Sequence, residues 1–506
     1  MGVTTTPAAE TPSVVPAAAM PRVPANSGGR AKASLSTITF GIFGLTTLAG
    51  VTVAGAGLFP VIFVAVAMVA GFVAYYRAPT RYINFVFLLW WFTPWVRRMV
   101  DYHHGFKPAN LVLVAPTLVT LISALTIFYR ARELRGQMLA PFTLTLAGVG
   151  YGYFIGLLKV GFFPATYALL TWVGPICFSA HLVLQWRIFP AMRNSFLTFV
   201  VWGLPIIAAY GIVQEVVLPG WDKYWLEAAE VFSIGMPVPF GFRAFGTLNT
   251  PGPYSVALLL GMLYLLGTAR RGMSISLSLA LIATLLTRTR SAWVALLIGV
   301  FVVQFMGPIR RIARNWLMIG FMFLLAVPVL SLDVFRDTIL SRIASFAELN
   351  QDGSVRNRLQ LSSMATQVIG SRAEGEGLGF TGGATKLGGI QRQASIDNGL
   401  LEVFYVLGWP GGSLVMLGLL GQLLTLFRFR DSRHDAFANS SRAIFWAMMS
   451  VLLIGDIFSG AVGAMFWASY GFACAAHSYN FASGIGLRSR QLAREFTAAS
   501  AAPGTA

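Results

Sequence analysis

The sequence predicts an all-α membrane protein that crosses the bilayer about fourteen times, give or take two. Apolar residues make up 56% of the 506 residues and charged residues only 11%, a balance that is typical of polytopic membrane proteins. Apolar runs of about 17–25 residues recur along the chain, which is the helix length needed to cross a hydrocarbon core of about 30 Å. Because backbone polar groups in lipid must be satisfied within the segment, we expect these runs to be helices.

The predicted architecture has two tails around one membrane domain. Residues 1–34 are rich in Ala, Pro, Ser and Thr, so we expect a disordered cytoplasmic tail there. This segment does not resemble a signal peptide, because its apolar residues come late and lack a convincing cleavage site. The membrane domain is expected at 35–486 and a second cytoplasmic tail at 487–506.

The apolar runs define the expected spans in order. The run at 82–96 is short, and the break near residue 287 leaves open whether its neighbours form one kinked helix or two. The expected spans are 36–55, 57–76, 82–96, 111–129, 139–158, 161–184, 195–217, 253–269, 273–287, 291–307, 316–332, 398–427, 442–459 and 460–483.

Basic residues predict how these spans are oriented. With a cytoplasmic N-terminus, most of the 37 lysines and arginines fall in the tails and in alternate loops, as the positive-inside rule requires. A short outer loop with Arg97, Arg98 and Lys107 goes against this rule. The same orientation puts two long loops, 218–252 and 333–397, on the outer side, and loops of this length are often functional. Cytoplasmic loops account for the net charge of +18, so no nucleic-acid partner is expected.

Two arginines interrupt one of the most apolar stretches of the chain, LALIATLLTRTRSAWVALLIGVFVVQF. Charges at this depth are costly, so Arg288 and Arg290 mark a candidate functional site. The predicted orientation puts them on the outer side together with Arg243, Arg356 and Arg358. Guanidinium groups suit phosphate and pyrophosphate, so the expected ligand is a membrane-embedded pyrophosphate such as the head group of a polyprenyl-linked sugar. The alternative is that each arginine pairs with an outer carboxylate or extends to the interface.

Two outer carboxylates stand at the start of a span, in SIDNGLLEVFYVLGWPGG. Asp397 is either a general base that takes a proton from an acceptor hydroxyl or a helix cap, and Glu402 follows it. Most of the other outer acids are expected to be solvated loop charges, and the intramembrane Asp456 is expected to pair with an arginine. The histidines and the two cysteines, Cys177 and Cys474, show no metal-site spacing, and no nucleotide-binding motif is present, so no cofactor is expected.

In their order along the chain, several segments resemble the bacterial O-antigen ligase/polymerase family of integral membrane proteins. They are RAFGTLNTPGPYS, LLTRTRSAWVALLIG, an outer loop with SVRNRLQ and EGEGLGF, and DNGLLEVFYVLGWPGG, within about residues 195–430. The resemblance implies a GT-C-like glycosyltransferase of the bacterial inner membrane with about 12–14 transmembrane helices, whose long loop and active site face the periplasm. It implies inverting, metal-independent transfer of a glycan from undecaprenyl pyrophosphate to a hydroxyl. The arginines that it assigns to the pyrophosphate are Arg243, Arg288, Arg290, Arg356 and Arg358.

The residue before the Asn of the last of these motifs separates two branches of the family. The ligase branch usually has a histidine there, whereas this chain has Asp397 before Asn398. This favours polymerisation of lipid-linked repeat units into O-antigen or exopolysaccharide, with Asp397 or Glu402 as the base. A ligase with a lipid or protein acceptor is the first alternative, and a lipid-linked oligosaccharide flippase or transporter is the second. The implied partners are the undecaprenyl-pyrophosphate-linked glycan, membrane lipid, a flippase and a chain-length regulator.

Overall fold

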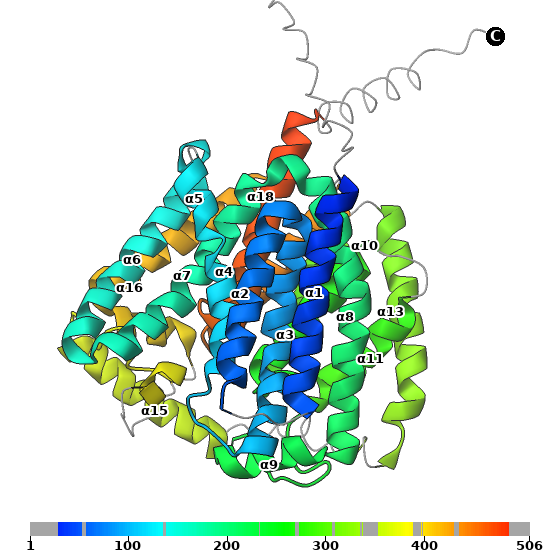
Figure 1. The fold of residues 1–506 in the computed structure, drawn as a ribbon, viewed down its shortest axis with the longest axis horizontal. Helices are drawn as coiled ribbons and strands as arrows, with labels where there is room; N and C mark the ends of the chain where they lie inside the picture. The colour runs from blue at the N-terminus through cyan, green and yellow to red at the C-terminus, as the bar shows by residue number, and fades with distance from the viewer. Residues whose placement is uncertain are drawn as a thin grey trace, which may run out of the picture.

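The computed structural model describes residues 29–52, 57–134, 138–231, 233–268, 273–305, 309–333, 336, 353–387, 396, 398–429 and 435–484. Within these residues the regular structure is helical (Figure 1), apart from an isolated β-bridge between Gly235 and Phe242. Eight of the described helical segments are long and apolar enough to cross a membrane. These features are those of an all-α multi-pass membrane protein, as the sequence predicts.

The helices follow one another along the chain with mostly short connections. The α-helices are α1 (Gly29–Thr52), α2 (Phe59–Arg77), α3 (Pro79–His104), α4 (Ala115–Leu121), α5 (Ala124–Arg130), α6 (Leu139–Lys159), α7 (Phe162–Leu184), α8 (Phe189–Val217), α9 (Gly220–Ala229), α10 (Pro251–Thr268), α11 (Ser274–Leu286), α12 (Arg290–Phe305), α13 (Ile309–Leu330), α15 (Gly353–Ser371), α16 (Gly399–Arg428), α17 (Ala436–Leu452) and α18 (Gly460–Ala482). The 3-10 helices are η1 (Leu111–Val114), η2 (Ala131–Glu133), η4 (Trp186–Ile188) and η5 (Gly382–Leu387).

The eight candidate spans are fewer than the twelve to fourteen that the sequence predicts. The run at 82–96 lies in α3, which continues into charged residues and therefore has a low mean hydropathy. The break near residue 287 separates two helices, α11 and α12, so these runs are not one kinked helix. Both are too short to count as spans by length. Helix α13 has 22 residues, but its apolar part, Ile312–Pro328, is shorter than a span. The shorter apolar segments are Ser274–Leu286, Arg290–Phe305 and Ile312–Pro328.

Helix α1 begins at Gly29, inside the segment 1–34 that the sequence predicts to be disordered. Each residue added to an existing helix gains a backbone hydrogen bond, so a helix extends readily beyond its apolar part. The rest of that tail and the tail expected at 487–506 lie outside the described residues.

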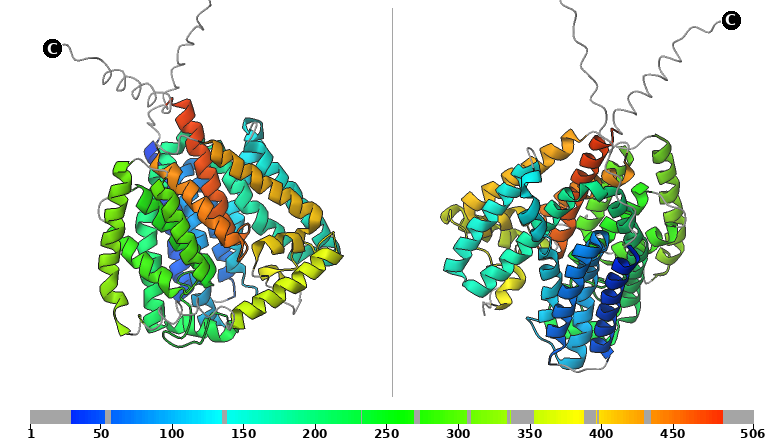
Figure 2. Two further views of the ribbon diagram at one scale, coloured as in Figure 1. Left: turned by 180° about the vertical axis from the view of Figure 1, so that it is seen from behind. Right: turned by 45° about the horizontal axis from the view of Figure 1, so that its top comes forward.

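Two groups of helices build the molecule. Most helices stand upright side by side, whereas α6, α15 and α16 form a tilted group beside them, which we call the wing (Figure 1). Helix α7 packs on both α6 and α18 and so joins the wing to the upright helices. Seen from behind, α18 stands between the wing and the green helices α10–α13 (Figure 2). A site between the two groups therefore draws on segments that are distant in sequence.

The two long loops of the chain share one end of the molecule. Helix α9 belongs to the loop 218–252 and helix α15 to the loop 333–397. Both lie at the end opposite to the beginning of α1 and the end of α18 (Figure 1). We call these the α9 end and the α1 end. The predicted orientation, with both long loops on one side, is compatible with this arrangement.

Helix α16 is broken near its middle, and the segment 373–377 compensates for the break. Gly408 has a φ of +64°, and Pro410 lacks the N–H group that the carbonyl of Val406 would accept in a helix. Gly377 N donates to that carbonyl at 2.8 Å instead. A backbone group that would be left unsatisfied inside a membrane is thereby paired.

Glycines let this segment reach backbone contact with the helices around it. Gly377 has a φ of +88°, and a Cβ added there would lie 2.4 Å from the backbone N of Gly156 in α6. A Cβ on Gly379 would lie 2.7 Å from the carbonyl carbon of Pro164 in α7. The sequence EGEGLGF thus packs between α6, α7 and α16, and its glycines are required for that close approach.

Candidate functional site

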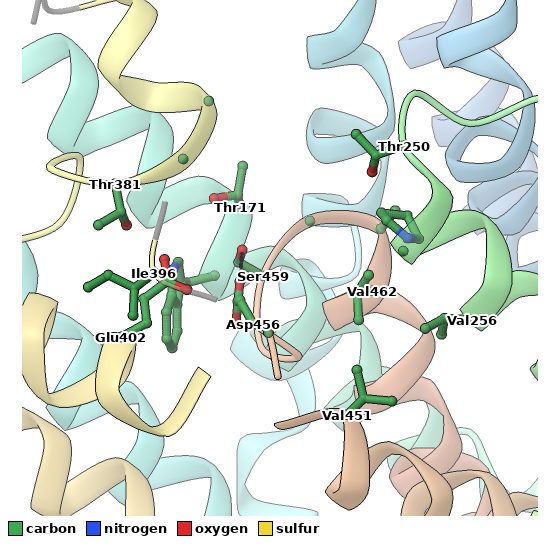
Figure 3. Close-up of a pocket in the computed structure, with 18 of the residues that line it drawn as sticks. Thr171, Thr250, Val256, Thr381, Ile396, Glu402, Val451, Asp456, Ser459 and Val462 are labelled. Atoms are coloured by element: carbon green, nitrogen blue, oxygen red, sulfur yellow. Dashed lines mark hydrogen bonds between the residues drawn. The ribbon is translucent and has the colours of Figure 1, made fainter. Parts of the chain in front are cut away.

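One cavity brings together residues of the predicted site. Its volume is about 580 Å³. Its wall comes from α7, the starts of α10 and α16, the segment 378–384, and the turns between α11 and α12 and between α17 and α18. Arg243, Glu402 and Asp456 line it. Figure 3 shows Glu402 on one wall, Thr250 on the opposite wall, and Asp456 between them. We call this the Arg243 cavity.

Arg243 is held against the turn between α11 and α12. Its Nε donates to the carbonyl of Thr287 at 3.2 Å, and its Nη2 donates to the hydroxyl of Thr289 at 2.9 Å. The next residue adds a backbone bond, because Ala244 N donates to the carbonyl of Leu286 at 3.1 Å. These contacts fix a half-buried guanidinium at the cavity wall. A phosphate in the cavity would meet a pre-positioned planar donor.

A buried ion pair fixes the loop that follows Arg243. The Nε of Arg98 lies 2.6 Å from a carboxylate oxygen of Asp222, and both side chains are 0% exposed. The same guanidinium donates to the carbonyl of Gly246 at 2.5 Å. Gln214 donates to Asp222 at 2.9 Å and accepts from Gly246 N at 2.8 Å. Side chains from α3, α8 and α9 thus hold the backbone of RAFGTLN in place.

These contacts explain the arginines that go against the positive-inside rule. Arg97 pairs with Asp101 at 2.8 Å in a buried i,i+4 contact, and Arg98 pairs with Asp222. Asp101 and Asp222 are therefore exceptions to the expectation that most outer acids are solvated loop charges. Each is buried because a neighbouring guanidinium compensates its charge. The two arginines thus stabilise the α9 end through buried ion pairs.

Arg288 lies outside the lining of the Arg243 cavity and has a carboxylate partner. Its Nη2 donates to Glu215 at 2.5 Å and to the carbonyl of Phe240 at 2.7 Å. Arg288 has a φ of +50°, a left-handed conformation that ends α11. This contact matches the alternative that an intramembrane arginine pairs with an acid. Its role at a pyrophosphate stays a prediction.

Arg290 is the first residue of α12 and is half-buried. Its chain neighbours Thr289 and Ser291 both line the Arg243 cavity. The turn between α11 and α12 therefore brings Arg290 to the edge of the cavity, although Arg290 itself does not contribute to the lining.

Glu402 reaches the cavity from the first turn of α16. The cap of this helix is Asn398, whose side chain accepts from Leu401 N at 3.1 Å. Asp397 lies outside the described residues. Its role as a base stays a prediction, whereas the capping role considered for it is filled by Asn398.

Asp456 adds a second carboxylate to the cavity wall. It lies in the turn between α17 and α18, outside the eight candidate spans. It accepts from Phe458 N at 2.7 Å and from the hydroxyl of Ser459, so the donors found on it are not the arginine that the sequence suggested. Burial raises the pKa of the Asp456 carboxyl. Its ionised form therefore takes up a proton more readily than an exposed aspartate does.

Neutral polar groups make up much of the remaining wall. Hydroxyl groups both donate and accept hydrogen bonds, and a few converging polar groups in a partly apolar cavity are typical of a ligand site. Aromatic rings come from α7. The hydroxyl and aromatic residues of the lining are Tyr167, Thr171, Trp172, Thr250, Ser255, Thr289, Ser291, Thr381 and Ser459.

Two predicted arginines are only partly described. Arg356 and Arg358 lie near the start of α15, at the α9 end, and their side chains are outside the described part of the structure. Sequence reasoning also missed Gln214 and Glu215. Gln214 holds the loop that follows Arg243, and Glu215 pairs with the side chain of Arg288. The signal was present, because both polar residues interrupt the apolar run IIAAYGIVQEVVL, as Arg288 interrupts its own run.

The cavity can combine a fixed cation, two carboxylates and several hydroxyls around one ligand. In the described part of the chain, no cluster of three His, Cys, Asp or Glu side chains is arranged to hold a metal ion. Cys177 and Cys474 are buried free cysteines. Comparisons of the chain with models of known protein families and with curated proteins found no match.

Proposed function

We propose that this protein is a membrane-embedded glycosyltransferase that polymerises undecaprenyl-pyrophosphate-linked repeat units into O-antigen or exopolysaccharide. The observation that carries the proposal is the Arg243 cavity, which holds a fixed guanidinium together with Glu402 and Asp456. Transfer from a pyrophosphate needs a cation for the leaving group and a base for the acceptor. The resemblance to the O-antigen ligase/polymerase family supports the substrate class and the inner membrane as the location. The orientation predicted from the basic residues supports an active site on the periplasmic side.

In the proposed reaction, a hydroxyl of the acceptor glycan attacks the anomeric carbon of the donor sugar. The new C–O bond forms as the C–O bond to the pyrophosphate breaks, so the anomeric configuration inverts. The bonding electron pair leaves with the pyrophosphate, whose growing negative charge is stabilised by Arg243. The proton of the acceptor hydroxyl passes to Glu402. As the family resemblance implies, the transfer is metal-independent.

The two alternatives differ from this proposal in different ways. A ligase would use another acceptor, and a flippase would catalyse no glycosyl transfer. Ligation to a lipid or protein uses the same donor, and Asp397 in place of the ligase histidine favours polymerisation. A flippase needs a continuous polar path, with charges distributed through the membrane. Here two ion pairs, Arg98 with Asp222 and Arg288 with Glu215, are internal contacts that fix the fold. These charges do not form a polar path, so the remaining charges at the cavity favour a localised site.

Replacing Arg243 tests the leaving-group role. We expect Arg243→Ala to abolish long-chain polymer while the protein remains in the membrane, and Arg243→Lys to restore little, because an ammonium group lacks the planar fork. The matched control is Arg187→Ala, since Arg187 is 60% exposed in η4, away from the cavity. Electrophoresis of the cellular polysaccharide measures the outcome, and polymer of normal length with Arg243→Ala would reject the role.

Replacing Glu402 tests the acceptor role. Loss of a general base typically lowers the rate about 100-fold or more, so Glu402→Gln is expected to reduce polymer formation to that extent in isolated membranes supplied with lipid-linked repeat units. A fully active Glu402→Gln variant together with an inactive Asp397→Asn variant would identify Asp397 as the general base instead of Glu402.

A further inference from the structure

Two apolar grooves on the surface of the upright helices share one polar end. The first, between α1 and α3, has a volume of about 840 Å³, and the second, between α3 and α8, about 470 Å³. Residues of helix α3 line both grooves. The residues that line both grooves are Arg81, Asn84, Leu88, Phe92 and Phe199.

The shared polar end contains a cation that is held by hydroxyl groups. The Nη1 of Arg81 donates to the hydroxyl of Ser36 at 3.0 Å and to the hydroxyl of Thr37 at 2.9 Å. Asn84 donates to the hydroxyl of Ser195 at 2.9 Å. Among the described residues, no carboxylate lies within ion-pair distance of Arg81. A positive charge at the mouth of two apolar grooves thus has no protein anion in that part of the structure.

The position of this end along the membrane normal suits a lipid head group. The candidate span of α1 begins at Leu35, one residue before Ser36, so Arg81 lies near the edge of the hydrocarbon layer. The first groove extends along α3 from Arg81 to Met99, about 27 Å at 1.5 Å per residue. This length is nearly that of the whole hydrocarbon core, about 30 Å. The groove therefore has room for a complete acyl chain.

We propose that this site binds one diacyl phospholipid with a net negative head group. The phosphate pairs with the guanidinium of Arg81, and one acyl chain occupies each groove. Two grooves with one shared cation match two chains with one shared phosphate, whereas a polyprenyl carrier has a single chain. The site lies on the α1, α3 and α8 face, and none of its lining belongs to the Arg243 cavity. The proposal is therefore independent of the proposed function.

Two pairs of matched variants test this proposal. Gly44 lines the first groove, whereas Gly41 does not, and a Cβ added to either meets no atom within 4 Å. Gly44→Phe therefore introduces a ring into the groove from a position with open space for its Cβ, and Gly41→Phe on the same helix is its control. Arg81→Gln removes the cation, and its control is Arg77→Gln, since Arg77 is an exposed arginine at the end of α2.

The measurement is phospholipid retention and thermal stability of the purified full-length protein. We expect native mass spectrometry to find one phosphatidylglycerol retained in preference to phosphatidylcholine. Phosphatidylglycerol should raise the unfolding temperature and inorganic phosphate should not. Arg81→Gln should weaken retention about tenfold, as expected for the loss of one charge-assisted hydrogen bond. Gly44→Phe should weaken retention comparably, and both controls should behave like the wild type.

Three results would overturn the proposal. The first is wild-type retention of phosphatidylglycerol by both Arg81→Gln and Gly44→Phe. The second is equal binding of phosphatidylglycerol and phosphatidylcholine, and the third is recovery of a polyprenyl lipid from the grooves in their place. If Arg81→Gln does not fold, Gly44→Phe against Gly41→Phe decides the question alone.

Discussion

Arg98 extends from α3, and its guanidinium contacts Asp222 in α9 and the backbone of Gly246 in the loop between α9 and α10. Removing one partner of a buried ion pair leaves an uncompensated charge, which typically costs about 3–5 kcal/mol. We therefore expect Arg98→Ala to lower the thermal unfolding temperature strongly. Because the same contacts hold the loop of Arg243, a variant that still folds should also lose polymer formation.

An exposed ion pair provides the control for this prediction. Arg130 and Glu133 lie 2.7 Å apart, but their side chains are 27% and 40% exposed. Exposed pairs contribute about 0–1 kcal/mol, so Arg130→Ala should change the unfolding temperature little. Equal losses from Arg98→Ala and Arg130→Ala would show that the Arg98 contacts are not specifically stabilising.

At the scale of single residues, the sequence predicted which charged residues lie at a cavity or inside the fold better than it predicted their partners. Arg243 and Glu402 both line the cavity. Arg288 instead pairs with Glu215, a residue 73 positions earlier in the chain. Hydropathy reveals that a charge is buried in an apolar run, but only the packing of α8 against α11 determines which carboxylate it meets.

At the scale of elements, the segment 373–377 and the break in α16 depend on each other. Gly377→Ala would force a non-glycine residue into a left-handed conformation, at a cost of about 1–3 kcal/mol, and would place a Cβ 2.4 Å from the backbone of Gly156. We expect a lower unfolding temperature and reduced polymer formation, because Leu378 and Gly379 line the cavity.

Gly383→Ala is the matched control, because a Cβ at Gly383 meets nothing within 4 Å. It should leave the unfolding temperature nearly unchanged. If Gly377→Ala were as stable as Gly383→Ala, the segment would have to move away from α6 without cost, and the close packing described above would not be required.

The apolar runs predicted most helices because burial in lipid requires long hydrogen-bonded segments. They did not predict how the break in α16 is compensated. The sequence GWPGG marks a helix that cannot continue regularly, yet nothing local identifies residues 373–377 as the donors to its free carbonyl. That pairing depends on tertiary contacts among α6, α7 and α16.

At the scale of the whole molecule, the charge distribution predicts which side of the membrane each end faces. Lys223 is exposed on α9, and Arg187 is exposed at the α1 end between α7 and α8. A membrane-impermeant maleimide should label Lys223→Cys in right-side-out vesicles, and Arg187→Cys only after permeabilisation. Cys177 and Cys474 are buried and should give little background. Labelling with the opposite sidedness would invert the orientation and move the proposed site to the cytoplasm.

Composition alone predicted an all-α membrane protein, because few soluble folds tolerate so apolar a chain. The division into upright helices and a wing was beyond that prediction, since it depends on contacts such as those of α7 with both α6 and α18. The cavity draws on both groups of helices, so its composition could be predicted only as a set of candidate residues.

The lipid-linked glycans of a strain that lacks this protein measure its proposed activity most directly. We expect single repeat units on the polyprenyl carrier and no long-chain polymer, with polymer restored by the wild-type chain and not by Arg243→Ala. Intact polymer together with uncapped lipid A–core would identify a ligase instead. Polymer of normal length, attached normally, would contradict glycosyl transfer at the Arg243 cavity.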